Sequence, residues 1–149
     1  MKLQPFDAAH ILVAAEVDAK CFPIQNFSVE LLQQLVSSPQ VMGYLAHHDD
    51  EVIGYMLVRH AAGEAEILTI AVLEKYRRKG YAEEMLTTCF TELQSQQVEK
   101  VYLEVRVSNT AACKLYEKFG GQQVAIRPKY YEAAAAGQME DAFVYCIVL

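Results

Sequence analysis

A strand-like run, a basic turn and an amphipathic helix follow one another between Ala65 and Leu93, and this order constrains the fold most. Residues 65–73 are largely apolar, which is typical of a buried strand. The basic turn Arg77-Arg78-Lys79-Gly80 comes next. A helix is then predicted because six small or apolar residues recur at the spacing of one helix face: Ala82, Met85, Leu86, Cys89, Phe90 and Leu93.

The turn in front of this helix has the chemistry of an anion site. The first N–H groups of a helix have no partner within the helix, and the helix dipole adds about half a positive charge there. Gly80 leaves the main chain open to a bulky anion, and Ala82 keeps the first turn uncrowded. Taken alone, such a segment is more often a basic turn before an ordinary surface helix, so the choice depends on the rest of the chain.

The glycine spacing differs from two common phosphate-binding motifs. A dinucleotide fingerprint needs G-x-G-x-x-G and a nucleotide P-loop needs G-x-x-x-x-G-K-(S/T), and neither string occurs in the sequence. The string Arg77-x-x-Gly80-x-Ala82 instead resembles the (Q/R)-x-x-G-x-(G/A) motif of the GCN5-related N-acetyltransferases, the GNAT superfamily. The resemblance implies that the anion is the diphosphate of acetyl-coenzyme A (acetyl-CoA), bound by Arg77, Arg78, Lys79, Gly80, Tyr81, Ala82 and Glu83.

A second segment resembles the same superfamily. Residues 101–106 read as a short strand, and a helix with Ala112, Leu115, Tyr116 and Phe119 on one face follows Ser108-Asn109-Thr110. Residues 103–117 are similar to the bacterial ribosomal-protein alanine N-acetyltransferases, the RimI group, as are residues 127–131 and 140–142. The resemblance covers roughly residues 64 to 145.

Amide formation from a thioester needs a neutral amine, although an α-amino group has a pKa of about 7.7 to 8.0. In the resembling family, the glutamate at the position of Glu104 takes the proton, directly or through a water. The alternative is a solvated ion pair with Arg106, because residues two apart on a strand share a face.

The departing thiolate needs a proton donor, which the resemblance implies is Tyr116, since phenols are protonated at neutral pH. The alternative is a core aromatic, because Tyr116 lies on the apolar stripe of its helix. Asn109 is a preferred helix N-cap, and the resemblance adds a contact with the cofactor.

Two further sets of contacts are implied by the resemblance. Main-chain groups of Ile70, Ala71 and Val72 are expected to bind the pantetheine arm as another strand would, while their side chains lie in the core. Tyr131 is expected to contact the acceptor. The alternative is that Tyr130 and Tyr131 are an exposed aromatic pair of a hairpin loop that also includes Ala133 to Ala136.

Composition fits one domain over residues 1–149. Nineteen Asp and Glu against thirteen Lys and Arg disfavour nucleic acid as a direct partner. The four cysteines lack C-x-x-C spacing and are expected to be reduced and mostly buried. No apolar run is long enough for a membrane helix, so the expected location is the cytoplasm. The turn His47-His48-Asp49-Asp50 is not expected to hold a metal, because adjacent turn residues point apart.

Helices are predicted near residues 8–19, behind Asp7, and near residues 31–36, behind Ser28. Strands are predicted at residues 41–46, 51–59, 122–127 and 142–148. Two departures from the family are notable: Gly121 stands where an aromatic residue usually follows the glycine, and the chain has no tryptophan.

The expected fold is therefore α/β: a mixed, mostly antiparallel sheet of six to seven strands, splayed between two central parallel strands, with helices on both faces. The expected activity is acetyl transfer from acetyl-CoA to the α-amine of a protein N-terminus, with the alanine of ribosomal protein S18 as one candidate. The alternatives are transfer to a small-molecule amine or a lysine side chain, and a non-catalytic CoA sensor. The sequence leaves the oligomeric state open.

Overall fold

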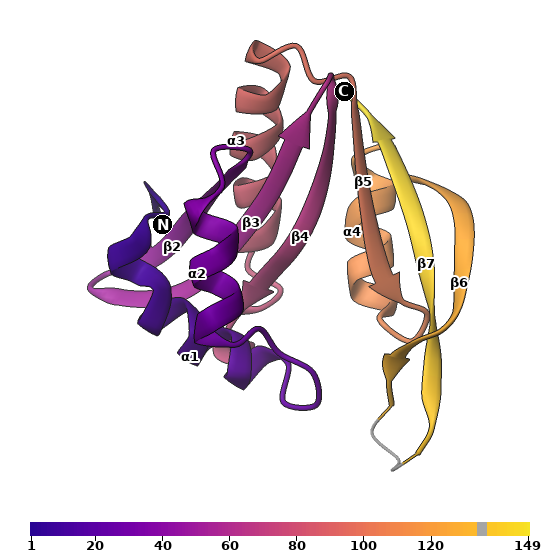
Figure 1. The fold of residues 1–149 in the computed structure, drawn as a ribbon, viewed down its shortest axis with the longest axis horizontal. Helices are drawn as coiled ribbons and strands as arrows, with labels where there is room; N and C mark the ends of the chain where they lie inside the picture. Colours follow the sequence, from indigo (N-terminus) through magenta and orange to yellow (C-terminus); the bar gives the residue numbers. More distant parts are fainter. Residues whose placement is uncertain (134–136) are drawn as a thin grey trace.

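The computed structural model describes residues 1–133 and 137–149, which form a seven-stranded sheet flanked by helices (Figure 1). The order across the sheet is β1-β2-β3-β4-β5-β7-β6, and all neighbours are antiparallel except β4 and β5. The mixed sheet expected from the sequence is confirmed. The strands are β1 (Lys2–Pro5), β2 (Val41–His48), β3 (Glu51–Ala61), β4 (Glu64–Val72), β5 (Lys100–Arg106), β6 (Gln122–Glu132) and β7 (Met139–Val148).

The predicted helices are present, and side chains cap several of them. Asp7 caps a short 3-10 turn that leads into the first α-helix, and the Ser28 hydroxyl accepts a hydrogen bond from the Leu31 N–H at 3.1 Å. The helical elements are η1 (Ala8–His10), α1 (Ile11–Cys21), α2 (Val29–Ser37), η2 (Glu74–Tyr76), α3 (Tyr81–Ser95) and α4 (Thr110–Lys118).

Helices on the two faces of the sheet enclose two hydrophobic cores. On one face, α1 and α2 pack on β2, β3 and β4, where Leu32, Tyr55 and Leu57 are buried. On the other face, α3 and α4 bury the larger core, which includes Met85, Leu86, Leu93, Leu103, Tyr116 and Ile147. Every apolar residue from Met85 to Leu93 that defined the predicted stripe of α3 is buried, so the helix prediction is confirmed.

The sheet divides where its two parallel strands meet. Only three residue pairs join β4 to β5: Glu64 with Lys100, Ala65 with Val101 and Glu66 with Tyr102. Beyond these pairs the strands diverge toward their carboxyl ends, as Figure 1 shows. A register shift in the pairing of β3 with β4 skips Leu68 at the start of the divergence. The splay expected between the central parallel strands is therefore confirmed.

Three predictions of local structure need correction. The polar turn expected over residues 47–50 is only Asp49-Asp50, because β2 continues through His48. Tyr130 and Tyr131 were expected in a loop, but they lie in β6, whose register with β7 shifts between Arg127 and Tyr131. Strand β1 was not predicted. Of the alanine run expected in the loop, residues 134–136 lie outside the described residues.

Gly121, where the family usually has an aromatic residue, fits the end of α4 closely. A Cβ at this position would lie 2.7 Å from the carbonyl oxygen of Tyr116, so a larger residue would have to displace the helix end. The Gly121 N–H donates to that same oxygen at 2.9 Å, and the Gly120 N–H donates to the Glu117 oxygen at 2.9 Å. Together they form a Schellman motif, with Gly120 at φ +80°. This helix end fixes the backbone of Tyr116.

Candidate active site

The basic turn lies between the end of β4 and the start of α3, at the open end of the splay (Figure 1). Gly80 is the N-cap of α3 with φ +85°, and no heavy atom lies within 4 Å of the position a Cβ would take. The first main-chain bond of the helix runs from the Glu84 N–H to the Gly80 oxygen at 3.0 Å. Among the described residues, no side chain caps this end. The N–H groups of the first turn therefore remain for another acceptor.

The side chains around this turn have different roles. Arg78 and Lys79 are exposed, and Arg78 has φ +59°. Arg77 donates from Nε to the Val72 carbonyl oxygen at 2.9 Å, which ties the turn to the end of β4. Glu83 pairs with Lys118 of α4 at 2.7 Å, so any contact it makes with an anion has to come from its main chain.

The strand residues expected beside the pantetheine arm lie in the second half of β4. Ala71 and Val72 are buried, and Ile70 is partly buried against the larger core. They pair with β3 on one side only, since the bonds between β4 and β5 end at Glu66. The side chains are core residues, as predicted, while the strand's second edge faces the splay.

Glu104 lies on β5 and forms an ion pair with Arg127 of β6. The expected alternative, a pair with Arg106, is wrong. Small or apolar residues of β7 separate the two strands: Glu104 is opposite Val144, and Arg127 is opposite Ala142. All four side chains share a face, so the long Arg127 side chain reaches across β7. The Glu104 side chain is 19 % exposed, so part of it remains open to an acceptor.

Arg106 instead holds the loop-side end of β6 and β7. Its Nη1 donates to the Glu132 carbonyl oxygen at 2.6 Å and pairs with Glu140 at 3.2 Å, and its guanidinium lies 4.6 Å from the ring centroid of Tyr131. Glu140 also accepts from the Ser108 N–H at 3.2 Å. Hydrogen bonding by Ser108, with the help of Arg106, lowers the pKa of Glu140.

Tyr116 is buried in α4, with its ring 6.4 Å from that of Tyr145. The structure records no hydrogen bond from its hydroxyl to another described residue. Burial, followed by the nearby Tyr131 and Cys113, raises the pKa of Tyr116 well above its usual range. The phenol is therefore protonated at neutral pH and has a proton to donate.

Tyr131 interacts electrostatically with both candidate catalytic groups. Burial and the Glu104 carboxylate raise its pKa to about 12, and Tyr131 in turn raises the pKa of Tyr116. Its ring is edge-on to Tyr130 at 4.8 Å, and Arg127 lies 4.2 Å from the centroid of Tyr130. The two rings therefore pack as a pair, but the pair lies in β6 rather than in a loop, and only Tyr130 is exposed. Asn109 is the predicted N-cap of α4 and accepts from the Ala112 N–H at 3.2 Å.

Sequence reasoning assigned no role to Arg127 or Asp18, and the partner it offered for Arg106 was wrong. Arg127 and Arg106 belong to recognised motifs, but their partners depend on the register of β5, β7 and β6. Asp18 is buried in α1, where it accepts from the Tyr55 hydroxyl and from the Phe27 N–H, both at 2.6 Å. Burial raises the pKa of Asp18 despite these two bonds. Asp18 thereby fixes the loop between α1 and α2, whose Gln25 accepts from the Glu132 N–H at 3.3 Å.

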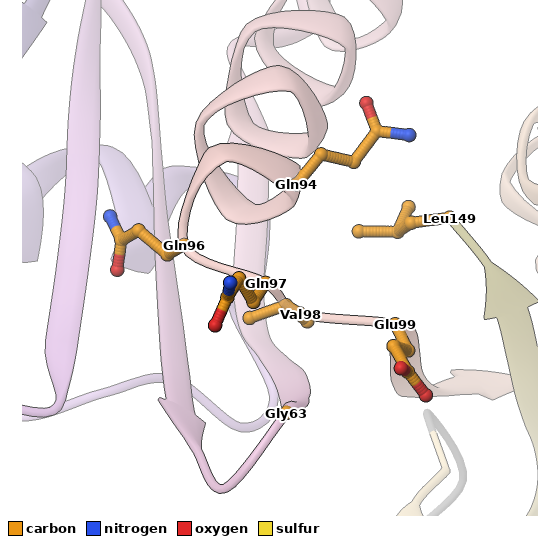
Figure 2. Close-up of a pocket in the computed structure, with 7 residues that line it drawn as sticks. All are labelled: Gly63, Gln94, Gln96, Gln97, Val98, Glu99 and Leu149. Atoms are coloured by element: carbon orange, nitrogen blue, oxygen red, sulfur yellow. The ribbon is translucent and has the colours of Figure 1, made fainter.

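A separate depression lies at the other end of α3, as Figure 2 shows. It has a volume of about 640 Å³, and glutamines form much of its wall: Gly63, Gln94, Gln96, Gln97, Val98, Glu99 and Leu149. None of the predicted site residues lines it.

Within residues 1–133 and 137–149, no group of three His, Cys, Asp or Glu side chains is arranged to hold a metal ion. The four cysteines are free, with Cys89 and Cys113 buried and Cys21 and Cys146 partly buried. Over the same part of the chain, no helix has both the length and the apolar character to cross a membrane.

A splayed mixed sheet with an uncapped helix N-terminus at its opening defines a site for an anionic ligand. The chain belongs to the acetyltransferase (GNAT) family, whose family model matches residues 10–121. Its family and the names of its relatives make it an N-acetyltransferase.

Its sequence relatives narrow the class further. It is 34% identical over 100 residues to a ribosomal protein bS18 alanine N-acetyltransferase of Haemophilus ducreyi, covering 67% of this chain and 68% of the relative. It is 36% identical over 133 residues to an N-alpha-acetyltransferase of Sulfurisphaera tokodaii, covering 80% of this chain and 77% of the relative.

Solved structures share the fold. The ribosomal-protein-S18-alanine N-acetyltransferase of Escherichia coli superposes with a TM-score of 0.91 at 22% identity, covering 99% of this chain and 92% of that one. Arabidopsis thaliana NAA60, solved in complex with acetyl-CoA, superposes with a TM-score of 0.83 at 19% identity, covering 99% and 98%. The chain thus shares its fold with a protein that was solved with acetyl-CoA bound.

Proposed function

We propose that this chain, as a single domain over residues 1–149, transfers an acetyl group from acetyl-CoA to the α-amine of a protein N-terminus. One observation carries the proposal: a basic turn and an uncapped helix N-terminus lie at the open end of the splay between β4 and β5. The names of the sequence relatives support the α-amine as acceptor, and the alanine of ribosomal protein S18 is the leading candidate.

In this proposal the donor lies in the splay. The diphosphate accepts hydrogen bonds from main-chain N–H groups of Gly80 to Glu83, while Arg77, Arg78 and Lys79 offset its charge. The pantetheine arm pairs with the free edge of β4 at Ile70, Ala71 and Val72. Asn109, at the start of α4, contacts the cofactor from the opposite side of the splay.

Two groups then carry the proton transfers. Glu104 takes a proton from the acceptor ammonium, directly or through a water, and the amine nitrogen attacks the thioester carbonyl carbon. When the tetrahedral intermediate collapses, the carbon–sulfur bond breaks and Tyr116 gives its proton to the departing thiolate. The attacking nitrogen loses its second proton to water, and the Tyr116 phenolate takes a proton back from water, so the product amide is neutral. The raised pKa keeps the Tyr116 phenol protonated until the thiolate forms, although it also makes the phenol a weaker acid.

The acceptor must reach Glu104 past Arg127. We infer that its ammonium takes the place of the guanidinium beside the carboxylate, while Tyr131 contacts the acceptor backbone. The ion pair between Glu104 and Arg127 marks the position of a positive group before the acceptor arrives.

Mass spectrometry of acetylated peptides tests the proposal. The purified protein is incubated with acetyl-CoA and a short peptide that begins Ala-Arg, and in parallel with a peptide that has a blocked N-terminus and one internal lysine. One added acetyl group on the free N-terminus alone is the expected result. Acetylation of the blocked peptide would move the acceptor to lysine. Binding of CoA without acetylation of either peptide would favour a small-molecule amine or a sensor.

A further inference from the structure

The hairpin between β2 and β3 contacts the basic turn from the side away from the splay. The Tyr81 hydroxyl and His48 Nδ1 are 2.9 Å apart, and the two rings lie 5.9 Å apart. His48 is the last residue of β2, whereas Tyr81 is the first residue of α3. A hydrogen bond thus joins the hairpin to the helix end that forms the anion site.

Tyr76, which precedes the basic turn, makes a second connection to the same hairpin. Its ring lies 5.4 Å from His48 and 6.0 Å from Tyr81, so the three rings form one cluster. Its hydroxyl donates to Glu51 at 2.6 Å, and Lys75 binds the same carboxylate oxygen at 3.0 Å. The hydrogen bond from Tyr76, followed by that from Lys75, lowers the pKa of Glu51. The hairpin therefore holds both ends of the segment from Lys75 to Tyr81.

The turn between these ends has a conformation that needs support. Arg78 has φ +59° and Gly80 has φ +85°, and a left-handed residue other than glycine persists only where its surroundings hold it. Lys79 Nζ lies 5.4 Å from the centroid of Tyr76, so the ring also orients a cation of the turn.

We propose that His48 and Glu51 are positioning residues for donor binding: through Tyr81 and Tyr76 they hold the basic turn in the shape that accepts a diphosphate. Neither residue contacts the reacting atoms. This inference rests on the proposed donor, whose diphosphate occupies the turn, and it assigns the hairpin to recognition of that part of the donor alone.

Kinetics with two acetyl donors distinguish this role from general support of the fold. Acetyl-CoA carries the diphosphate, and acetyl-pantetheine has the same thioester without it. His48→Leu is expected to raise the KM for acetyl-CoA and the Kd for CoA about fivefold, the effect of one hydrogen bond. Its kcat with acetyl-CoA and its kcat/KM with acetyl-pantetheine should stay within about twofold of wild type.

Three further variants sharpen the test. Tyr81→Phe removes only the hydroxyl and should reproduce His48→Leu. His48→Asn restores an acceptor near the position of Nδ1 and should recover most of the CoA affinity. His60→Leu changes a histidine of similar burial at the far end of β3 and should leave both donors unaffected.

Equal losses with both donors, or an unchanged Kd for CoA in His48→Leu and Tyr81→Phe, would overturn the inference. Calorimetric measurement of CoA binding needs no acceptor, so it tests the hairpin even if the peptide assay fails. Wild-type protein that binds CoA but acetylates no peptide would contradict the proposed function. The Kd values for CoA of the variants would then decide the positioning role by themselves.

Discussion

Two buried tyrosines with adjacent rings have separate expected roles. Tyr116→Phe should lower kcat by a factor of about 100 or more, because the thiolate loses its proton donor, and should change the Kd for CoA little. Tyr145→Phe is the matched control, since its hydroxyl donates to Glu117 at 3.1 Å and serves the structure. Steady-state kinetics and calorimetry measure both effects. Unchanged kcat in Tyr116→Phe would mean that another group protonates the thiolate.

A carboxylate outside the proposed chemistry gives a pH-dependent test. The folded-state pKa of Glu140 is below its ordinary value of 4.5, so its contribution to stability is present above that value and is lost as pH falls through the folded-state pKa. Glu140→Gln should therefore lower the free energy of unfolding at about pH 7, and the difference from wild type should shrink on acidification below about pH 4.5.

Urea denaturation across this pH range measures the difference. Glu99→Gln removes the same charge from an exposed position and is the matched control. A constant difference for Glu140→Gln at every pH would mean that its bonds to Ser108 and Arg106 do not favour the charged form.

Local sequence predicted single residues well where their partners are near in sequence. Asn109 and Ser28 cap the helices that directly follow them, as predicted. The alternative partner predicted for Glu104 was wrong, because the observed partner lies on a strand that meets Glu104 only in the folded sheet. Arg106 is the nearest cation in sequence, whereas Arg127 becomes the nearer one only when β7 lies between β5 and β6.

At the scale of elements, two glycines with similar backbone geometry allow a matched experiment. Gly80 is the N-cap of α3 at φ +85° and Gly120 follows α4 at φ +80°. At neither position would a Cβ come within 4 Å of another described residue beyond the chain neighbours. Alanine at either position should cost about 1 kcal/mol of stability through backbone strain alone. Only Gly80→Ala should weaken CoA binding, because only that glycine lies in the anion turn.

Thermal unfolding and calorimetry compare the two variants. Equal CoA affinity in Gly80→Ala and Gly120→Ala would count against the anion turn, since their stability costs are matched.

Element boundaries were predicted where periodicity is uninterrupted. The apolar stripe of α3 defined that helix, but Pro128 and Lys129 interrupt the pattern of β6, so Tyr130 and Tyr131 were assigned to a loop. The structure absorbs the interruption in a register shift, where the Lys129 N–H donates to Asp141 at 2.9 Å. Strand β1 has only four residues and ends in proline, which leaves little pattern to detect.

At the scale of the whole molecule, the splay predicts where ligand protection should appear. Hydrogen exchange with and without CoA should show slower exchange in β4 from Ile67 to Val72 and in the turn from Arg77 to Ala82. Among the residues that the structure describes, none pairs with the second edge of β4 there, so CoA is expected to shield it. Protection confined to the depression near Gln97 would place CoA elsewhere and contradict the proposed donor site.

The same splay has a consequence for solubility. An open sheet edge offers its N–H and C=O groups to any passing strand, and proteins usually cover or interrupt such edges to avoid aggregation. Here two edges face each other inside one molecule, across an angle that opens from the last pair, Glu66 and Tyr102. A strand of another protein could reach either edge only by entering the wedge, whose two sides come together at that last pair. The divergence of β4 and β5 therefore leaves main-chain groups open to a slender ligand while it limits the room for a whole strand near the closed end.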